Sequence, residues 1–430
     1  MRRVTVLACA LLILAAGATS VAAQQRDTAK TPQERIRERL RNLGPLITDT
    51  TTRDTTATDS IPPDSLRPRL SPRKGRRSSQ ARAAEHDRPR SGASRDGWGG
   101  EPVDALVTGA TGFIGSRLAE RLALRGHRVS AFGAERTPQE AERRRQLESR
   151  GIRVHIGRLD DGALLRSLTR GVDTVFHLAA AQHESNAGAR YFRAVNVEGT
   201  RNLLDACEEA GVRRFVYGST IGVYGSARNG RLDETSATRP ENIYGLTKLE
   251  AEREVARRGA LGWTIVRISE TYGPGDRRLA KLFRLVDTSI VPIIGSGTNE
   301  HHPVYVDDLV AGLELAATIP EAVGETIVLA GKDIVATREL IESIAAALGK
   351  PLRSVKLPLG PFLVAAVMCE TGCRPFGISP PWHRRRLDFY VKRFYFSLEK
   401  AERLLGYRPT VSFRDGARET AAWYRSHGYL

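Results

Sequence analysis

The sequence is poor in the residues that build metal centres and disulfide frameworks. Only four cysteines occur among 430 residues. Cys369 and Cys373 are four residues apart but have no histidine or acidic partners at metal-ligand spacing, and Cys207 lies on the apolar face of a predicted helix. We therefore predict no metal site. Cysteine usage does not indicate the redox compartment.

Long apolar runs are also missing. The run from Val4 to Ala16 is too short to span a bilayer, but it follows two arginines and precedes small residues. This pattern predicts a signal-peptide-like segment over residues 1–23. A second run, Leu359 to Met368, is long enough for a core helix or an interfacial lid but not for a membrane span.

Large apolar residues are scarce between residues 24 and 100, where Thr, Asp, Arg, Pro, Ser and Gly dominate. Such a segment cannot offset its ordering entropy, so we predict a disordered basic linker. Residues 1–100 hold 19 Lys and Arg against 10 Asp and Glu, which is +9 of the total net charge of +17. The basic run Arg73 to Arg77 has no interleaved aromatic residues, so we predict no nucleic-acid partner.

A glycine-rich stretch from Thr108 to Gly115 stands out from the rest of the chain. It follows an apolar run that predicts a buried strand and leads into residues spaced like one helix face. Gly109 permits a tight turn, Gly112 lets the backbone approach a pyrophosphate, and Gly115 allows the helix to pack closely on the strand. The stretch predicts a dinucleotide site at the start of this helix.

Tyr244 and Lys248 form a second informative pair. Four residues span about one helical turn, so both side chains would point into one site. There the ammonium would favour the phenolate and lower the tyrosine pKa, which makes Tyr244 a general base near neutral pH. The alternative is a solvated helix face, although Tyr244 is the only one of eleven tyrosines with a lysine four residues on.

With these two stretches, the chain resembles the extended short-chain dehydrogenase/reductase family, which includes nucleotide-sugar epimerases and dehydratases and 3β-hydroxysteroid dehydrogenases. The resemblance covers roughly Val103 to Leu430. Its further motifs, in the family's order, are His177 to Ala180, Asn196 to Thr200, Ser219 to Gly225, Tyr272 to Gly275, Val304 to Asp308 and Leu405 to Pro409.

Strand and helix patterns alternate from Val103 to about Ile268. This alternation predicts an α/β fold with a doubly wound parallel Rossmann sheet and a ligand at the carboxyl ends of its strands. We assign residues 101–270 to the NAD(P)-binding domain. In the family, the following part forms a smaller C-terminal α/β substrate-binding lobe, here residues 271–430, interleaved with the first domain. Its helical stretches are expected near 279–289, 307–318, 337–348 and 397–405.

The resemblance implies the site residues. Tyr244 would move the hydroxyl proton, Lys248 would hold the cofactor ribose and stabilise the phenolate, and Thr220 would orient the substrate oxygen. For Thr220 the alternative is a satisfied hydroxyl at a strand end. Beside Tyr244 and Lys248, the implied cofactor-binding residues are Gly109, Gly112, Phe113, Ile114, Gly115, Glu135, Arg136, Leu159, Asp160, Ala179, Ala180 and Asn196.

The choice between NAD and NADP depends on Glu135 and Arg136, which follow the second predicted strand. The carboxylate suits a ribose 2′-hydroxyl and the guanidinium suits a 2′-phosphate. We predict NAD, with NADP as the alternative. Near the adenine, the family often has Gly-Asp-Leu-x-Asp, whereas this chain has Arg158 at the first Asp, so that contact is in question.

The substrate class is open. Sugar-nucleotide members often carry an arginine where this chain has His301, although Arg277, Arg278 or Arg384 to Arg386 would supply the charge. His301 and His302 are interpreted as loop residues. The apolar run after Leu359 favours an apolar substrate, and the basic, aromatic stretch from Arg384 to Phe396 resembles the tail region of sterol dehydrogenases. Plain domain packing is the alternative for both.

The leading hypothesis is an NAD(P)-dependent epimerase, dehydratase or oxidoreductase that acts on the hydroxyl of a nucleotide-linked sugar. A 3β-hydroxysteroid or terpenoid dehydrogenase and a non-catalytic dinucleotide sensor or scaffold are the alternatives. We expect a small-molecule substrate, a homodimer and peripheral membrane contact. A secretory leader conflicts with a cytosolic dinucleotide, so export, a wrongly assigned start and an inner-face tether all remain open; we favour a cytosol-facing catalytic core.

Overall fold

The computed structural model describes residues 102–430, except 183–187, 226–228, 289 and 374–392. These residues belong to one compact unit, Ser91–Leu430. The predicted leader and linker lie outside the described residues, as do Arg384 to Arg386. Within the described ranges, no helix combines the length and apolar character needed to cross a membrane. No group of three or more potential metal ligands gathers there either.

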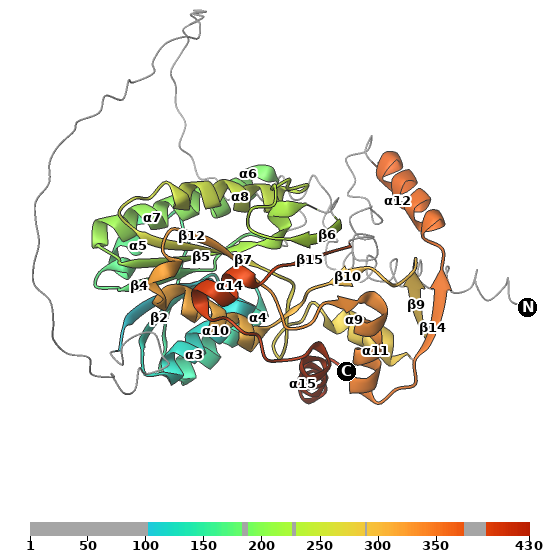
Figure 1. The fold of residues 1–430 in the computed structure, drawn as a ribbon. Helices are drawn as coiled ribbons and strands as arrows, with labels where there is room; N and C mark the ends of the chain where they lie inside the picture. Colours follow the sequence, from blue (N-terminus) through green and yellow to red (C-terminus); the bar gives the residue numbers. More distant parts are fainter. Residues whose placement is uncertain (1–101, 183–187, 226–228, 289, 374–392) are drawn as a thin grey trace, which may run out of the picture. The chain divides into compact units, whose positions relative to one another are not determined.

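A seven-stranded parallel sheet forms the centre of the described chain, as predicted (Figure 1). From β1 the chain builds outward in one direction and then returns to the other side of β1, so the strand order reverses between β1 and β4. Ligands of such sheets bind outside the carboxyl ends of the strands at this reversal. In spatial order the strands are β12 (Glu325–Leu329), β7 (Gly262–Ile268), β5 (Arg214–Thr220), β4 (Thr174–His177), β1 (Asp104–Thr108), β2 (Arg128–Gly133) and β3 (Arg153–Ile156).

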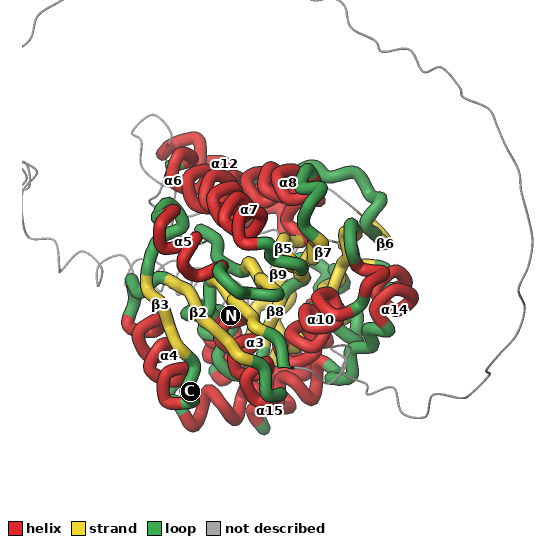
Figure 2. Tube along the Cα trace, turned by 90° about the vertical axis from the view of Figure 1, so that its left-hand side faces the viewer, coloured by secondary structure: helices red, strands yellow, loops and turns green. Residues whose placement is uncertain are grey.

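Helices cover both faces of the sheet (Figure 2). One face carries α3 (Phe113–Leu124), α4 (Pro138–Ser149) and α10 (Val306–Thr318), and the other carries α5 (Gly162–Thr169), α7 (Gly199–Ala210) and α8 (Ile243–Ala256). The start of α4 is fixed by a capping box between Thr137 and Glu140. This two-sided cover explains why the strands are apolar along most of their length.

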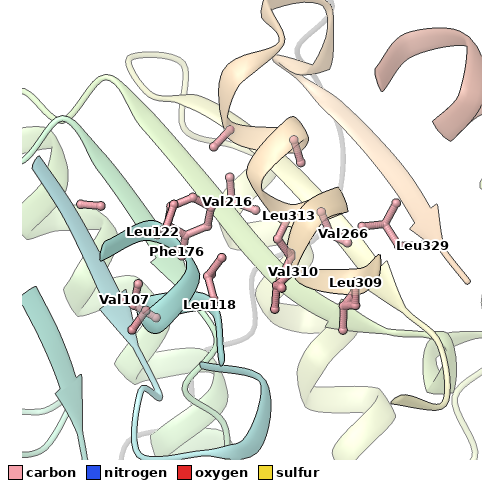
Figure 3. Packing of buried hydrophobic residues seen from close by; sticks show 14 of the residues in the cluster. Val107, Leu118, Leu122, Phe176, Val216, Val266, Leu309, Val310, Leu313 and Leu329 are labelled. Carbon is pink, nitrogen blue, oxygen red and sulfur yellow. The ribbon is translucent and has the colours of Figure 1, made fainter. Parts of the chain in front are cut away.

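The core beneath α3 and α10 shows how the sequence pattern becomes packing (Figure 3). Leu118 and Leu122 lie one turn apart on α3 and contact the sheet beside Phe176. All three side chains are fully buried, and each such burial stabilises the fold by about 1.5 to 3 kcal/mol. The packing holds α3, and therefore the glycine turn before it, firmly against the sheet.

The C-terminal part contributes one strand to the central sheet and builds its own small core. The strand is β12, which the sequence did not predict to join the sheet; it pairs with β7 in parallel. The predicted helices after residue 270 are confirmed as α9 (Ala280–Asp287), α10, α11 (Thr337–Leu348) and α14 (Glu399–Leu405), and α15 (Phe413–Ser426) follows. Side chains of α9, α11 and α15 form the small core.

Pairs of short strands lie outside the central sheet. They are β6 (Asn229–Leu232) with β15 (Arg393–Phe396), β8 (Thr271–Tyr272) with β11 (Val304–Tyr305), β9 (Ile290–Ile294) with β14 (Arg353–Leu357), and β10 (Glu300–His301) with β13 (Val335–Ala336). Short helical segments complete the fold: α6 (Ala189–Arg193), a π-helical turn at Ala194–Glu198, and 3₁₀ turns at Ile221–Tyr224 and Pro320–Ala322.

The apolar run after Leu359 forms α12 (Leu359–Cys373). Its interpretation as a core helix is wrong, because Ala366 is its only buried residue and Met368 is 69% exposed. Figure 1 shows α12, in orange, standing off from α9 and α11. The exposed apolar side chains include Val364 and Val367.

Candidate active site

The glycine turn has the geometry that a pyrophosphate needs. Gly109 has a φ of +70°, and the Gly112 amide donates to its carbonyl at 2.9 Å. A Cβ on Gly112 would lie 2.9 Å from that oxygen, and one on Gly115 would lie 2.3 Å from it. No side chain caps α3 and no acidic residue lies in its first turn. The first amides of α3 are therefore available to an anion, and the turn before them is packed too tightly to admit a Cβ at Gly112 or Gly115.

Thr220 and Tyr244 meet at the carboxyl edge of β5. Thr220 ends β5, and the Asn242 side chain caps α8 by accepting from the Gly245 amide at 2.9 Å. A Cβ on Gly245 would lie 2.6 Å from the Gly222 carbonyl, so α8 starts tightly against the turn after Thr220. The Thr220 hydroxyl lies close enough to the Tyr244 side chain to act on its pKa, in the direction that favours the phenolate.

The predicted effect of Lys248 on Tyr244 is wrong for the chain without ligands. Burial raises the pKa of Tyr244 to about 12, while Thr220 and the charge of Arg278 act in the opposite direction. Desolvation therefore outweighs every favourable contact of the phenolate. Arg278, rather than Lys248, supplies the positive charge that Tyr244 experiences.

Lys248 is the most deeply buried cation of the site. It is 1% exposed, and its Nζ lies 4.0 Å from the centroid of the Tyr217 ring. Burial lowers the pKa of Lys248 to about 7, and the charge of Glu252 opposes this shift. Glu252 follows Lys248 by one turn of α8 and forms a buried ion pair with Arg267 at 2.8 Å.

A buried chain of hydrogen bonds links β1 to α8. The Thr200 hydroxyl donates to the Asn196 carbonyl at 2.7 Å, so it accepts from His177 Nε2 at 2.9 Å. His177 Nδ1 then accepts from the Thr108 hydroxyl at 2.7 Å, which fixes the tautomer. The Asn196 amide donates to the Thr247 hydroxyl at 3.0 Å. The strand before the glycine turn is thereby tied to the residue before Lys248.

Most of the predicted cofactor-binding residues gather at this edge of the sheet. Ala179 and Ala180 follow β4, and a Cβ on Gly109 would lie 2.6 Å from the Ala179 amide. The Asn196 side chain forms two hydrogen bonds with the backbone of Ala181: its Oδ1 accepts from the amide and its Nδ2 donates to the carbonyl. Phe113 and Ile114 begin α3 and pack against the core, and Leu159 is buried against α7.

The predicted contacts to the adenosine half have partners within the protein. Glu135 forms an ion pair with Arg144 at 2.6 Å, and the Arg136 guanidinium is bonded to the Tyr191 hydroxyl. Asp160 is paired at 2.6 Å with Arg158, whose side chain is 72% exposed. Their roles toward the cofactor remain predictions. To contact the adenosine, each side chain would have to bind it beside its present partner or give that partner up.

Sequence reasoning missed a cavity next to Thr220. His301 and His302 are both buried. His301 belongs to the two-residue strand β10 and bonds to Thr337, so its interpretation as a loop residue is wrong, whereas His302 lies in the loop between β10 and β11, as interpreted, and donates to the Gly331 carbonyl at 2.9 Å. Glu270 lies two residues after the end of β7. Ligands bind at the carboxyl ends of the strands, so this position could have identified Glu270 as a site residue from the sequence. The cavity is lined by Ile221, Glu270, Glu300, His301, His302, Phe394 and Phe396.

Arg278 lies near Phe113, the first residue of α3 after the glycine turn. Its Nε donates to the Asp276 carboxylate and its Nη2 to the Thr271 carbonyl, both at 2.9 Å. The guanidinium carbon is 6.0 Å from the centroid of the Phe113 ring. Arg278 is thus a fixed but half-exposed cation at the rim of the site.

Comparison with known proteins places this arrangement in a family. Residues 105–330 match the family model described as the NAD dependent epimerase/dehydratase family. The chain is 30% identical to a 3-beta-hydroxysteroid dehydrogenase of Mycolicibacterium neoaurum over 342 residues, which cover 74% of this chain and 90% of that protein. It is also 30% identical to a dTDP-glucose 4,6-dehydratase of Streptomyces griseus over 336 residues, covering 75% and 94%.

Solved structures agree with the sequence comparisons. MoeE5 in complex with UDP-glucuronic acid and NAD superimposes with a TM-score of 0.60 at 28% identity, over 75% of this chain and 99% of that one. The UDP-glucuronic acid 4-epimerase of Bacillus cereus, in complex with NAD, gives 0.62 at 25% identity, over 76% and 100%. The predictions of an extended short-chain dehydrogenase/reductase enzyme and of NAD as cofactor are confirmed at the level of the family. The chain belongs to the NAD-dependent epimerase/dehydratase family.

Proposed function

We propose that this enzyme oxidises a secondary hydroxyl of a nucleotide-linked sugar to a carbonyl, or reduces that carbonyl back, as an epimerase, dehydratase or dehydrogenase. One observation carries the proposal: Thr220 at the end of β5 lies beside the Tyr244 phenol and acts on its pKa, and Tyr244 precedes the buried Lys248 by one helical turn. Proton transfer at a hydroxyl needs this set of groups within one site. The glycine turn at the same sheet edge fits the dinucleotide.

Each side chain has a distinct task. NAD, when bound, supplies the acceptor for the substrate hydride. Thr220 holds the substrate oxygen by hydrogen bonding, and Tyr244 takes or returns the proton of that oxygen. Arg278 and the Thr220 hydroxyl both favour the phenolate, which offsets part of the cost of its burial. Lys248, charged below a pKa of about 7, contributes a cation next to the ribose position.

Arg278 supports a nucleotide-linked substrate. Its guanidinium is pre-organised by Asp276 and the Thr271 carbonyl, while its exposed part is free to meet a diphosphate at the mouth of the site. Similar proteins of solved structure are complexed with UDP-glucuronic acid and with UDP-glucose. A diphosphate held at Arg278 would place the sugar toward Thr220.

A 3β-hydroxysteroid-type dehydrogenase is the second candidate. It is favoured by the apolar wall of the cavity, formed by Ile221, Phe394 and Phe396, and by the similarity to the enzyme of Mycolicibacterium neoaurum. A dehydrogenase releases NADH, whereas an epimerase retains its cofactor through the cycle. Net NADH formation with a sterol, and none with any sugar nucleotide, decides for this candidate.

The predictions about membrane contact, the homodimer and the N-terminal segments belong to the same proposal. Peripheral membrane contact is supported by the exposed Val364, Val367 and Met368 of α12, while the homodimer follows from the family resemblance alone. Residues 1–23 would act as a targeting leader or tether and residues 24–100 as a disordered linker. Detection of linker peptides in the mature periplasmic protein by mass spectrometry would contradict the cytosol-facing core.

Replacement of Tyr244 by Phe tests the proposed chemistry. The ring still fills its place, but the proton carrier is lost, so we expect turnover to fall by at least about a hundredfold, in line with the contribution of general acid-base catalysis. NAD binding, measured by calorimetric titration, should persist. Tyr429→Phe is the matched control, since Tyr429 stacks on Trp423 far along the chain from α8. Full activity of Tyr244→Phe would contradict the proton-transfer role.

A further inference from the structure

A buried ion pair lies directly behind Thr220. Ser219 and Arg267 are partners in the parallel register of β5 and β7, so their side chains lie next to each other on one face of the sheet. Glu252 of α8 contacts both of them. Its Oε1 accepts from Ser219 Oγ and, at 3.1 Å, from Arg267 Nε, and its Oε2 accepts from Arg267 Nη2 at 2.8 Å. Both carboxylate oxygens are thereby bonded to the sheet.

The same ion pair holds the turn that follows Thr220. Arg267 Nη1 donates to the Tyr224 hydroxyl at 2.9 Å and to the Glu234 carbonyl at 3.3 Å. Tyr224 is the last residue of the 3₁₀ turn that begins directly after Thr220. The segment around Thr220 is therefore bonded to one ion pair at Ser219 and again at Tyr224, with Thr220 between the two attachment points.

Glu252 connects this segment to the helix that carries the phenol and the ammonium. Tyr244, Lys248 and Glu252 follow one another at intervals of four residues along α8, so they lie along one side of the helix. The Tyr244 phenol and the Thr220 hydroxyl are thus both attached to the same buried carboxylate, one through two turns of helix and the other through its neighbour Ser219. This arrangement fixes the two groups relative to each other.

These side chains are buried, and their charged groups are occupied within the protein. Ser219, Tyr224, Glu252 and Arg267 are each at most 7% exposed. Four hydrogen bonds use most of the five N–H groups of the guanidinium. A buried ion pair adds little net stability over apolar side chains, because desolvation of the two charges often costs as much as their attraction returns. Stability alone therefore does not account for two charges at this place.

We propose that Glu252 and Arg267 are positioning residues for the reaction. Through both ends of the segment around Thr220, they hold the Thr220 hydroxyl beside the Tyr244 phenol. The inference rests on the proposed function, because it takes Thr220 and Tyr244 to act on the substrate hydroxyl. A displacement of about 1 Å between reacting groups can lower the rate about a hundredfold, so loss of this support should lower kcat rather than weaken binding.

The double variant Ser219→Ala, Tyr224→Phe tests the inference without breaking the ion pair. It removes the hydroxyl at each end of the segment, while Glu252 and Arg267 still neutralise each other. With UDP-glucose and NAD as probes, we expect kcat to fall by about tenfold or more, whereas KM and the NAD dissociation constant stay within about twofold. Each single change disturbs the core less and should lower kcat by about threefold. Thr169→Val is the matched control, since it removes a buried hydroxyl that donates to a carbonyl of α7 at 3.1 Å, and it should leave kcat unchanged.

Crystal structures of the parent protein and the double variant measure the geometry without a substrate. We expect the distance between Thr220 Oγ1 and Tyr244 Oη to change by about 0.5 Å or more, the tolerance of a catalytic constellation. An unchanged distance or an unchanged kcat overturns the inference, and so does a loss of NAD affinity as large as the loss of kcat. If the parent protein does not turn over UDP-glucose, the proposed substrate is contradicted, and the distance between Thr220 and Tyr244 still decides the inference.

Discussion

The ammonium nitrogen of Lys248 lies 4.0 Å from the centroid of the Tyr217 ring. Both side chains are fully buried, and Tyr217 sits in β5 three residues before Thr220. A cation over an aromatic face is stabilised most where water is excluded, by about 2 kcal/mol or more. Tyr217 therefore provides a platform that holds Lys248 beside the cofactor position.

The platform predicts a difference between two replacements of Tyr217. Tyr217→Phe keeps the ring and should retain most of the activity, whereas Tyr217→Leu removes the π-face and should lower kcat/KM by about tenfold or more. Turnover and the NAD dissociation constant measure the effect. If the Phe and Leu variants behave alike, the ring face does not position Lys248.

Lys248→Met should stabilise the chain without ligands in a pH-dependent way. The folded chain binds this proton with a pKa of about 7, against an ordinary value of 10.5, so the unfolded chain binds more protons between these pH values. The free energy of unfolding of the parent protein therefore rises with pH in this window, by up to about 1.4 kcal/mol per pH unit from this group. The increase in the free energy of unfolding caused by Lys248→Met should be larger at pH 7 than at pH 9.5 in urea titrations. An equal increase at both pH values would contradict the lowered pKa of Lys248.

Gly115→Ala should damage the glycine turn. The added Cβ would lie 2.3 Å from the Gly109 carbonyl oxygen, so backbone must shift, at a cost of about 1 to 3 kcal/mol. We expect a lower thermal midpoint and weaker NAD binding in calorimetry. Gly162→Ala is the matched control, because its Cβ would meet only the flexible Arg166 side chain at 3.4 Å. A normal NAD affinity for Gly115→Ala would rule out the predicted close packing.

Glu252→Leu should destabilise the fold strongly. It leaves the Arg267 guanidinium buried without its carboxylate, and loss of one partner of a buried pair costs about 3 to 5 kcal/mol. The double change with Arg267→Met should cost clearly less than the sum of the single changes, as measured by urea titration. Lys350→Met, in an exposed pair with Asp287, should change stability by less than about 1 kcal/mol. If the stability loss of the double variant equals the sum of the losses of the two single variants, the pairing of Glu252 with Arg267 is contradicted.

Local spacing explains which parts of the site were predictable. The glycine turn and the pair of Tyr244 and Lys248 are each defined within a few residues, so a helix or turn fixes their geometry. Thr220 was assigned from the family resemblance, because it stands where the family carries its active-site Ser or Thr. The hydrogen-bond chain through His177 was not predicted, since it depends on which strands become neighbours.

Long-range pairing accounts for what was missed. The cavity brings Glu270, His301 and Phe396 together from separate strands, and no spacing in the sequence links them. The raised pKa of Tyr244 also depends on the burial of α8 rather than on the lysine one turn away. Likewise, the partner of Glu135 is Arg144, which only the packing of α4 reveals.

The placement of β12 has a consequence for how the protein can be made. Because β12 comes after the predicted boundary near residue 270 yet pairs with β7, a fragment ending there would present a bare row of amides and carbonyls along β7. On the ribosome, the central sheet is incomplete until Leu329 has emerged. A fragment made by cutting the gene at that boundary should therefore associate through the uncovered edge of β7.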